Sequence, residues 1–310
     1  MKVTKGLKKV LSNNPSILTL GTFDGIHQGH RKIISKLINE AQKDNLKTII
    51  LTFFPHPKNI TTNEIIKSIS TIDEKIEIFS ELGVDELIIQ NFNKSFSNMN
   101  AEEFIILLVN KLNLKKIIVG YNHRFGKNRS ADINVLRELS LKYDFEVIEI
   151  KAFEVEKIKI SSTKIRNAII EGNIDICNNY LGYNFNINGD VVKGKSIGKS
   201  IGFPTANINI EEKYKIIPKN GVYLVRCFFE KDNYYGMMNI GFNPTFGFNE
   251  KTIEVNIFDF DKDLYGKSIS IEFLKFIRDE ITFDNVEKLQ NQLINDRENC
   301  IKHINSTYNN

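Results

Sequence analysis

The first half of the chain alternates short, continuous apolar runs with longer amphipathic segments. Strand-like runs are predicted at 17–20, 47–54, 84–90, 116–119 and 145–150. Helix-like segments lie between them at 31–42, 73–82, 101–112 and 132–143. Strands that are apolar along their whole length and separated by helices favour a parallel sheet covered on both faces. The first half is therefore predicted to be a doubly wound α/β domain, which binds ligands beyond the carboxyl ends of its strands.

After about residue 183 the pattern changes to short strand-like segments without helices between them. These segments are predicted at 186–193, 221–229, 234–240, 252–258 and 268–273. Such a series is typical of an antiparallel β-barrel. Residues 231–233 suggest a hairpin tip, and residues 285–303 suggest one closing helix with Asp284 as its N-cap. The sequence thus predicts two domains, 1–183 and 184–310.

Length and composition are those of an ordinary globular protein. The 310 residues suffice for two hydrophobic cores, and the net charge of +4 is spread along the chain without a dense basic run. The three cysteines lack metal-ligand spacing, and the amino-terminal segment fits neither a signal peptide nor a membrane span. We therefore expect a cytoplasmic protein, a monomer or weak homo-oligomer, that binds neither nucleic acid nor membranes.

A segment rich in glycine and histidine follows the first predicted strand and opens the first predicted helix. It runs from Gly21 to His30 and reads GTFDGIHQGH. His27 and His30 are three residues apart, so they lie on one face of the helix start. A helix N-terminus binds phosphate readily, and imidazoles beside it can donate hydrogen bonds to phosphate oxygens. The segment predicts a triphosphate cradle. The alternative is that one histidine caps the turn while the other is a satisfied core residue, and Asp24 could hold a metal or merely fix the turn.

A second phosphate-binding candidate reads ISSTKIR and ends at Arg166. Ser161 or Ser162 would cap a helix that starts near Thr163 and would present hydroxyl and N–H groups to phosphates. Arg166, about one turn into that helix, could hold β- and γ-phosphate oxygens. Because such a serine and threonine cluster is often only a helix cap, its assignment depends on the histidine segment.

These two segments resemble the nucleotide-binding signature of nucleotidyltransferases, in the form found in prokaryotic bifunctional riboflavin kinase/FAD synthetases. Further matches are FFPHP at 53–57 and GYNHRFGK at 120–127. The resemblance implies a Rossmann-like domain in which the FMN phosphate attacks the α-phosphorus of ATP and releases pyrophosphate. Positioning and charge stabilisation can carry such a transfer, with His27 and His30 catalytic. The implied ATP site consists of Gly21, Phe23, His27, His30, Asn122, Ser162 and Arg166.

In the second half, residues 189–196 read GDVVKGKS and match the P-loop pattern. We do not expect a P-loop, because that loop must lead into a helix, and glycines and a proline follow within a few positions. The wider segment 189–207 ends in GFPTAN and resembles the riboflavin kinase signature, which implies a glycine-rich flap over ATP phosphates. The implied kinase site consists of Gly189, Lys195, Gly202, Pro204, Thr205, Asn207 and Arg278. The Thr205 hydroxyl and Asn207 amide suit Mg²⁺ bound together with phosphates, although a proline turn with a self-satisfied asparagine is the alternative.

Alternation in the strand predicted at 252–258 puts Glu254 on the face opposite Ile253 and Val255. A carboxylate there could simply be solvated. The resemblance instead implies that Glu254 is the general base for the ribityl 5′-hydroxyl of riboflavin, so that the chain would convert riboflavin through FMN to FAD with ATP and Mg²⁺. The chain departs from the family at two kinase positions, with Lys199 in place of arginine and Asn256 in place of histidine.

Three other functions fit parts of the sequence: an enzyme with only one of the two reactions, a flavin-binding regulatory or storage protein, and a nucleotidyltransferase for another phosphorylated small molecule. Pure binding would not require six retained polar residues, which are His27, His30, Arg166, Thr205, Asn207 and Glu254. The last alternative would leave the second domain without a purpose. The sequence therefore favours the bifunctional enzyme.

Overall fold

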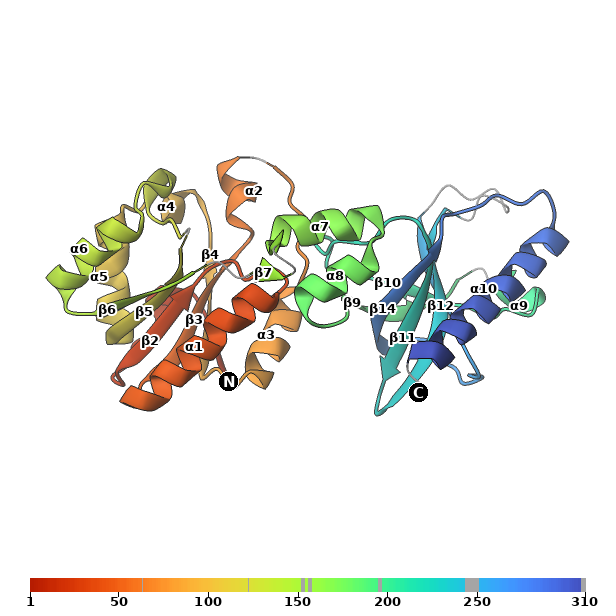
Figure 1. Ribbon diagram of the computed structural model, residues 1–310, viewed down its shortest axis with the longest axis horizontal. Helices are drawn as coiled ribbons and strands as arrows, with labels where there is room; N and C mark the ends of the chain where they lie inside the picture. The colour runs from red at the N-terminus through yellow and green to blue at the C-terminus, as the bar shows by residue number, and fades with distance from the viewer. Residues whose placement is uncertain are drawn as a thin grey trace. The chain divides into compact units, whose positions relative to one another are not determined.

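The computed structural model describes residues 1–62, 64–121, 123–151, 154–155, 158–194, 197–242 and 251–307. The chain divides into two compact units, Met1–Ser162 and Thr163–Asn310 (Figure 1). The units part at the start of helix α7 (Ser162–Glu171), so α8 (Ile174–Leu181) belongs to the second unit. The boundary predicted at residue 183 concerns the functional domains and stays a prediction.

A six-stranded parallel sheet forms the centre of the first unit, with the strand order β1-β4-β3-β2-β5-β6. Its strands are β1 (Lys2–Lys5), β2 (Ser16–Leu20), β3 (Lys47–Phe54), β4 (Glu86–Asn91), β5 (Leu114–Gly120) and β6 (Glu146–Ile150). From β2 the chain proceeds to β3 and β4 on one side and to β5 and β6 on the other. The topological switch point, where such sheets bind ligands, therefore lies beyond the carboxyl ends of β2 and β5.

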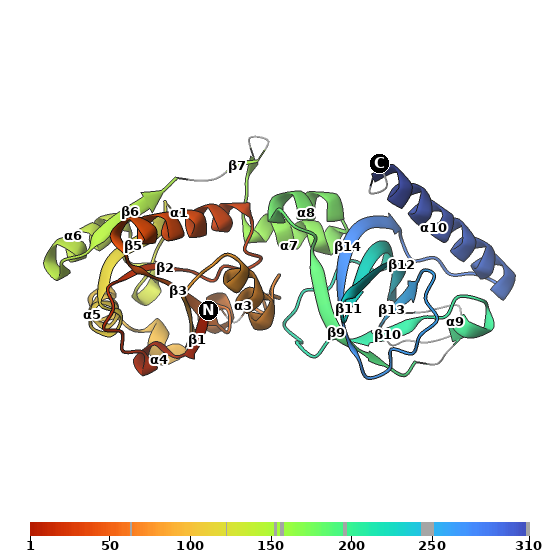
Figure 2. The same cartoon turned by 90° about the horizontal axis from the view of Figure 1, so that it is seen from below.

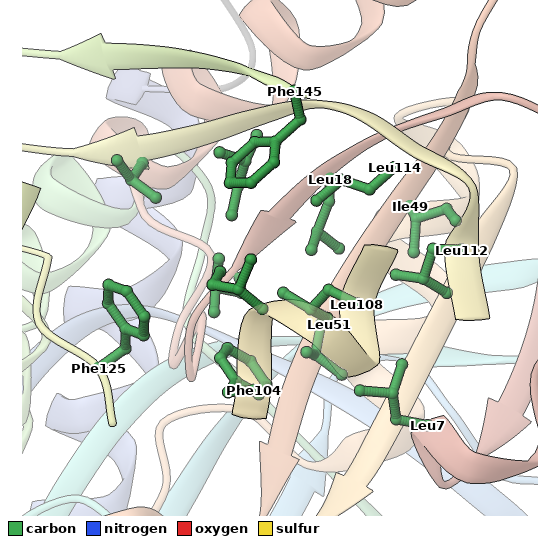
Figure 3. Close-up of a cluster of buried hydrophobic side chains, with 14 of the residues drawn as sticks. Leu7, Leu18, Ile49, Leu51, Phe104, Leu108, Leu112, Leu114, Phe125 and Phe145 are labelled. Atoms are coloured by element: carbon green, nitrogen blue, oxygen red, sulfur yellow. The ribbon is translucent and has the colours of Figure 1, made fainter. Parts of the chain in front are cut away.

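Helices cover both faces of this sheet. The longer ones are α1 (Gln28–Asp44), α3 (Ile72–Glu81), α5 (Ala101–Leu112) and α6 (Ile133–Tyr143). Successive residues of β3 alternate between two apolar clusters, with Ile49 and Leu51 on the side of α5 and α6 and Ile50 on the side of α1 and α3. Figure 3 shows the first of these clusters, in which Phe104 and Leu108 of α5 lie beside Leu51 of β3. The predicted doubly wound domain is confirmed.

The ends of these helices follow local signals. Thr71 and Glu74 form a capping box at the start of α3, and Asn100 and Glu103 form another at the start of α5. Asn113 ends α5 in the left-handed conformation. The shorter elements of the unit are η1 (Leu7–Lys9), α2 (Pro57–Thr61), α4 (Lys94–Ser97), η2 (Lys127–Arg129), β7 (Glu154–Val155) and β8 (Ile158–Lys159).

A closed antiparallel barrel forms the centre of the second unit, with the strand order β10-β13-β12-β11-β14-β9 (Figure 2). Its strands are β9 (Asn186–Val192), β10 (Ala206–Asn209), β11 (Gly221–Phe229), β12 (Asp232–Gly241), β13 (Thr252–Ile257) and β14 (Ser268–Arg278). The helix α9 (Ile197–Ser200) connects β9 to β10, and α10 (Val286–Thr307) packs Cys300 and Ile304 against Val222. The predicted barrel with a closing helix is confirmed.

Several strands differ from the sequence prediction. The sequence does not predict β1 and β10, because each has four residues with few apolar ones. The hairpin between β11 and β12 turns at Glu230 and Lys231 and not at 231–233, since Asp232 already pairs with Phe229. Glu230 takes a left-handed φ of 56°, which lets so short a turn close.

Two further expectations concern helix starts and the apparent P-loop. Asn285, not Asp284, caps α10, because its Oδ1 accepts the N–H of Lys288 at 2.9 Å. The rejection of a P-loop is confirmed, because Gly189 lies inside β9 and pairs with Ile269 of β14. In the described part of the chain, no helix combines the length and the apolar character needed to cross a membrane.

Candidate active sites

The segment between β2 and α1 lies at the switch point of the sheet. Gly21 follows β2, and its N–H donates to the carbonyl oxygen of Leu51 in β3 at 3.1 Å. His27 is the N-cap residue of α1, and its Nδ1 accepts the N–H of His30 at 3.3 Å. A neutral imidazole that accepts through Nδ1 carries its proton on Nε2. His27 therefore caps the helix and keeps an Nε2–H donor, so capping and phosphate binding are compatible roles.

The two imidazoles form a stacked pair beside the helix start. Their centroids are 3.7 Å apart and their planes differ by 14°, while the ring of Phe23 meets His30 edge-on at 5.2 Å. Burial lowers the pKa of His27 to about 4. Burial, with further contributions from His27 and Lys75, holds the pKa of His30 well below its usual range. Both rings are thus neutral at pH 7, and the buried Nδ1 of His30 has no hydrogen-bond partner among the described residues.

The turn before this pair is conformationally strained. Phe23 and Ile26 have φ values of 46° and 35°, in the left-handed region that bulky side chains avoid. Each such residue costs about 1–3 kcal/mol, so the surrounding structure must hold the turn. The carbonyl oxygen of Thr22 accepts hydrogen bonds from Nζ of Lys75 at 2.9 Å and from Oγ1 of Thr52 at 3.2 Å. Donors from α3 and β3 therefore fix the peptide unit that precedes Phe23.

Asp24 is buried in the same turn. Its Oδ1 accepts the N–H groups of Ile69 at 2.9 Å and Ser70 at 3.2 Å. Its carbonyl oxygen accepts the hydroxyl of Ser162 at 2.8 Å. Of the two roles that the sequence leaves open for Asp24, these contacts support fixing the turn. They also place Ser162 next to the histidine segment.

A row of aromatic rings lies at the carboxyl ends of neighbouring strands. Phe53, near the end of β3, lies 5.7 Å from Phe92, which follows β4. Phe96 of α4 lies 5.7 Å from Phe92 and 5.8 Å from Phe104, measured between centroids. Three of these rings, those of Phe53, Phe92 and Phe96, are half-buried, so the row offers a partly exposed aromatic surface. The sequence gives no signal of this row, because its rings come from separate segments.

In the second unit, three residues with side-chain oxygens lie close together, on β10, on β13 and directly before β10. The hydroxyl of Thr205 donates to Oε2 of Glu254 at 3.0 Å, and Asn207 stands opposite Glu254 in the register of the two strands. Hydroxyl, amide and carboxylate oxygens are hard ligands of the kind that Mg²⁺ prefers when it binds together with phosphates. The structure thus brings Thr205, Asn207 and Glu254 together as the sequence predicts.

The segment between β9 and β10 depends on close backbone packing. A Cβ added to Gly194 would collide with the amide of Asn207, and one added to Gly198 would collide with the carbonyl oxygen of Phe203. Asn256 donates through Nδ2 to the carbonyl oxygen of Pro204 at 2.7 Å. Asn256 therefore fixes the residue just before Thr205.

Two family models and several curated relatives match the chain. The model of FAD synthetase matches residues 9–164, and that of riboflavin kinase matches residues 181–304. The bifunctional riboflavin kinase/FMN adenylyltransferase of Buchnera aphidicola subsp. Schizaphis graminum is 39% identical, over 98% of this chain and 99% of its own length. That of Escherichia coli strain K12 is 34% identical, over 96% of each. The chain belongs to the bifunctional riboflavin kinase/FMN adenylyltransferase family.

Family membership confirms the predicted pair of activities and their order along the chain, with FAD synthetase first and riboflavin kinase second. A crystal structure named for a macrolide-efflux protein from Streptococcus pneumoniae is 34% identical, with a TM-score of 0.87 over 96% of this chain and 98% of that chain. That name describes a different activity from the one carried by the curated relatives, so this likeness supports the architecture and not the activity.

Several residues that the sequence predicts to bind ligands are not part of the histidine cluster or of the cluster around Thr205. Asn122 and Lys195 lie outside the described residues. Arg166 lies in α7, within the second unit. Gly189 lies three residues from Val192, which pairs with Asn207, and is therefore roughly 10 Å along β9 from the kinase cluster. Two others, Gly202 and Pro204, lie between α9 and β10, and their predicted role over the ATP phosphates stays a prediction.

Arg278 makes a buried ion pair. Its guanidinium donates to both carboxylate oxygens of Asp296 at 2.7–3.0 Å, and Asp296 is 1% exposed. Gln292 donates to the same carboxylate at 2.9 Å. Arg278 thus ties β14 to α10, and its predicted contact with a ligand stays a prediction.

Proposed function

We propose that the first unit binds the ATP triphosphate at the start of α1 and uses His27 and His30 to stabilise the charge that develops during FMN adenylylation. A phosphate oxygen of FMN attacks the α-phosphorus, the bond between the α-phosphorus and the bridging oxygen breaks, and pyrophosphate leaves. The observation that carries this assignment is the Nδ1 contact of His27 with the N–H of His30, which leaves Nε2–H as a donor. The row of rings from Phe53 to Phe104 supplies a surface suited to the flavin ring.

We propose that Glu254 is the general base of riboflavin phosphorylation in the second unit. Its carboxylate accepts the proton of the ribityl 5′-hydroxyl while that oxygen attacks the γ-phosphorus, and ADP leaves. The contact between the Thr205 hydroxyl and Oε2 of Glu254 supports this role, because it places the carboxylate beside a residue of the flap. Asn256 orients the Pro204 carbonyl and with it the start of β10.

The same cluster fits a magnesium ion. The donors present are the hydroxyl of Thr205 and the amide of Asn207, and the glycine at 194 leaves the amide the space that a Cβ would fill. Thr205 and Asn207 would hold the ion together with the ATP phosphates. When bound, Mg²⁺ neutralises phosphate charge and orients the transferred group.

The remaining assignments follow from the two-site arrangement. We propose functional domains at 1–183 and 184–310, with Gly21, Phe23, Asn122, Ser162 and Arg166 completing the ATP site of the first. Lys195, Gly202 and Arg278 would contribute to the second.

The buried, unpaired thiols of the three cysteines suit a reducing cytoplasm. We propose a monomer or weak homo-oligomer that acts on small molecules, without a nucleic-acid partner.

Single substitutions test the two assignments, because each reaction can be assayed separately in the same chain. We expect His27→Asn to lower FMN adenylylation by about 100-fold or more through loss of one transition-state donor. We expect Glu254→Gln to lower riboflavin phosphorylation by about 100-fold or more through loss of the base. We expect each variant to keep the other reaction, and this retained activity shows that the variant is folded.

Glu230→Gln is the matched control, because Glu230 is an exposed carboxylate of the same unit that pairs only at the surface with Lys267. Rates are measured from FMN to FAD and from riboflavin to FMN with ATP and Mg²⁺. Riboflavin phosphorylation that stays within tenfold of wild type in Glu254→Gln would reject Glu254 as the base.

A further inference from the structure

Lys75 is a buried lysine beside the histidine pair. It lies in the first turn of α3 and is 5% exposed. Lysine is almost never so buried without a specific interaction. Its ammonium group donates to the carbonyl oxygen of Thr22 at 2.9 Å, inside the segment that opens the nucleotide site. The nucleotide-binding signature does not extend to α3, so the sequence gives no reason to assign Lys75 to this site.

The contact acts on the peptide unit that precedes Phe23, one of the two strained residues of the turn. Rotation of the peptide unit between Thr22 and Phe23 changes ψ of the first residue and φ of the second. Fixing the direction of the Thr22 carbonyl therefore favours the left-handed φ of 46° at Phe23. That conformation brings the Phe23 ring to 5.2 Å from His30. Lys75 thus reaches the imidazole pair through two covalently linked residues.

The charge of Lys75 also affects the pair directly. Its positive charge is one of the causes that keep His30 neutral, after burial and the neighbouring His27. A fixed positive charge near the start of α1 adds to the positive end of the helix dipole, which favours a polyphosphate at that position. The hydrogen bond of Lys75 and its positive charge therefore both support a role at the start of α1.

We propose that Lys75 is a positioning residue of the adenylyltransferase site, because it fixes the Thr22–Phe23 peptide unit and so the packing of Phe23 against His30 at the start of α1. This inference rests on the proposed function of His27 and His30. Lys75 acts through the turn and need not touch the substrate.

Lys75→Met tests the proposal, because methionine has a similar length and volume but neither charge nor donor. We expect kcat/KM for FMN adenylylation to fall by about 10- to 100-fold, the effect of losing a hydrogen bond of a charged group. Riboflavin phosphorylation by the same chain stays within twofold. Lys75→Arg, which keeps the charge and a donor, recovers most of the loss. Lys142→Met is the matched control, since Lys142 pairs with Glu102 at the surface.

A histidine titration by NMR provides a readout that a purely structural lysine would not move. The chain has five histidines, so the signals can be assigned by substitution. We expect the pKa of His30 to rise in Lys75→Met and to stay at its wild-type value in Lys142→Met. Adenylylation within twofold of wild type in Lys75→Met overturns the proposal, and so does an equal loss of both activities.

Thr52→Val keeps the proposal testable if Lys75→Met does not fold. This change removes the second donor to the Thr22 carbonyl and preserves side-chain shape. We expect adenylylation to fall by about 3- to 10-fold, the effect of one neutral hydrogen bond, with phosphorylation unchanged. An unchanged adenylylation rate would overturn the proposal.

If His27→Asn and Lys75→Met both retain full adenylylation, the proposed function of the histidines fails. If only Lys75→Met retains full adenylylation, the inference about Lys75 alone fails.

Discussion

His27 combines two tasks at the residue scale because its two ring nitrogens differ. Nδ1 accepts the N–H of His30 and satisfies one of the donors that every helix start leaves unpaired. Nε2 then carries the proton and can donate to a phosphate oxygen. The capping contact therefore sets the tautomer that phosphate binding needs, and a protonated ring could not serve as the cap acceptor.

This arrangement has a consequence for stability against pH. The pKa of His27 is about 4 in the folded chain and 6.5 when unperturbed. Between these values the unfolded state binds more protons, so stability falls as the pH drops from about 6.5 toward 4. We predict that His27→Asn, which retains a capping oxygen, loses less stability over this range, by up to about 3 kcal/mol.

Urea unfolding followed by circular dichroism at a series of pH values from 7.5 to 4.5 measures this difference. Groups other than His27 and the neighbouring His30 titrate alike in both proteins, so their contributions cancel when the two curves are subtracted. Curves that run parallel for wild type and His27→Asn would contradict the low pKa of His27 and the buried capping role behind it.

At the scale of elements, α10 is held to the barrel by one buried ion pair as well as by apolar packing. Arg278 of β14 and Asp296 of α10 form several hydrogen bonds, and Asp296 is almost fully buried. We predict that Asp296→Ala lowers the free energy of unfolding of the second unit by about 3–5 kcal/mol, because it leaves a buried charge without its partner.

A surface pair on the same helix supplies the control. Arg297 of α10 lies 3.1 Å from Asp259, whose side chain is 90% exposed, so Asp259→Ala should cost about 0–1 kcal/mol. Thermal and urea unfolding compare the two variants. Equal costs for both would show that the Arg278 pair is not a structural tie between β14 and α10.

The elements that the sequence predicts best are those with strong periodicity and clear end signals. The α5 helix runs from Ala101 to Leu112, and the capping box of Asn100 and the left-handed Asn113 set its bounds. The strands β1 and β10 carry no such signal, because they are short and their stability comes from pairing with distant strands. Local end signals can be predicted from the sequence, and pairing between distant strands cannot.

The same limit applies to the sites. His27, His30, Thr205 and Glu254 stand in recognisable segments, and the structure places them in two clusters. Lys75 supports the first cluster from a helix whose pattern predicts only amphipathic packing. Contacts between segments distant in sequence depend on the tertiary fold, so no spacing rule reveals them.

At the scale of the whole molecule, each unit has its own core and its own cluster of candidate site residues. The histidine pair belongs to the parallel-sheet unit, and the Thr205 and Glu254 pair belongs to the barrel unit. Both reactions use ATP, yet the residues proposed to catalyse them do not overlap. FMN is the product of one site and the substrate of the other, so loss of either site alone should stop FAD formation at a defined compound.

Complementation between two variants tests the central claim of two independent sites most directly. Glu254→Gln and His27→Asn are incubated separately and together with riboflavin, ATP and Mg²⁺, and the flavins are separated by chromatography. We predict that Glu254→Gln leaves riboflavin unchanged, that His27→Asn accumulates FMN, and that the mixture forms FAD. Substantial FAD formation by either variant alone, or none by the mixture, would contradict this division of the two reactions.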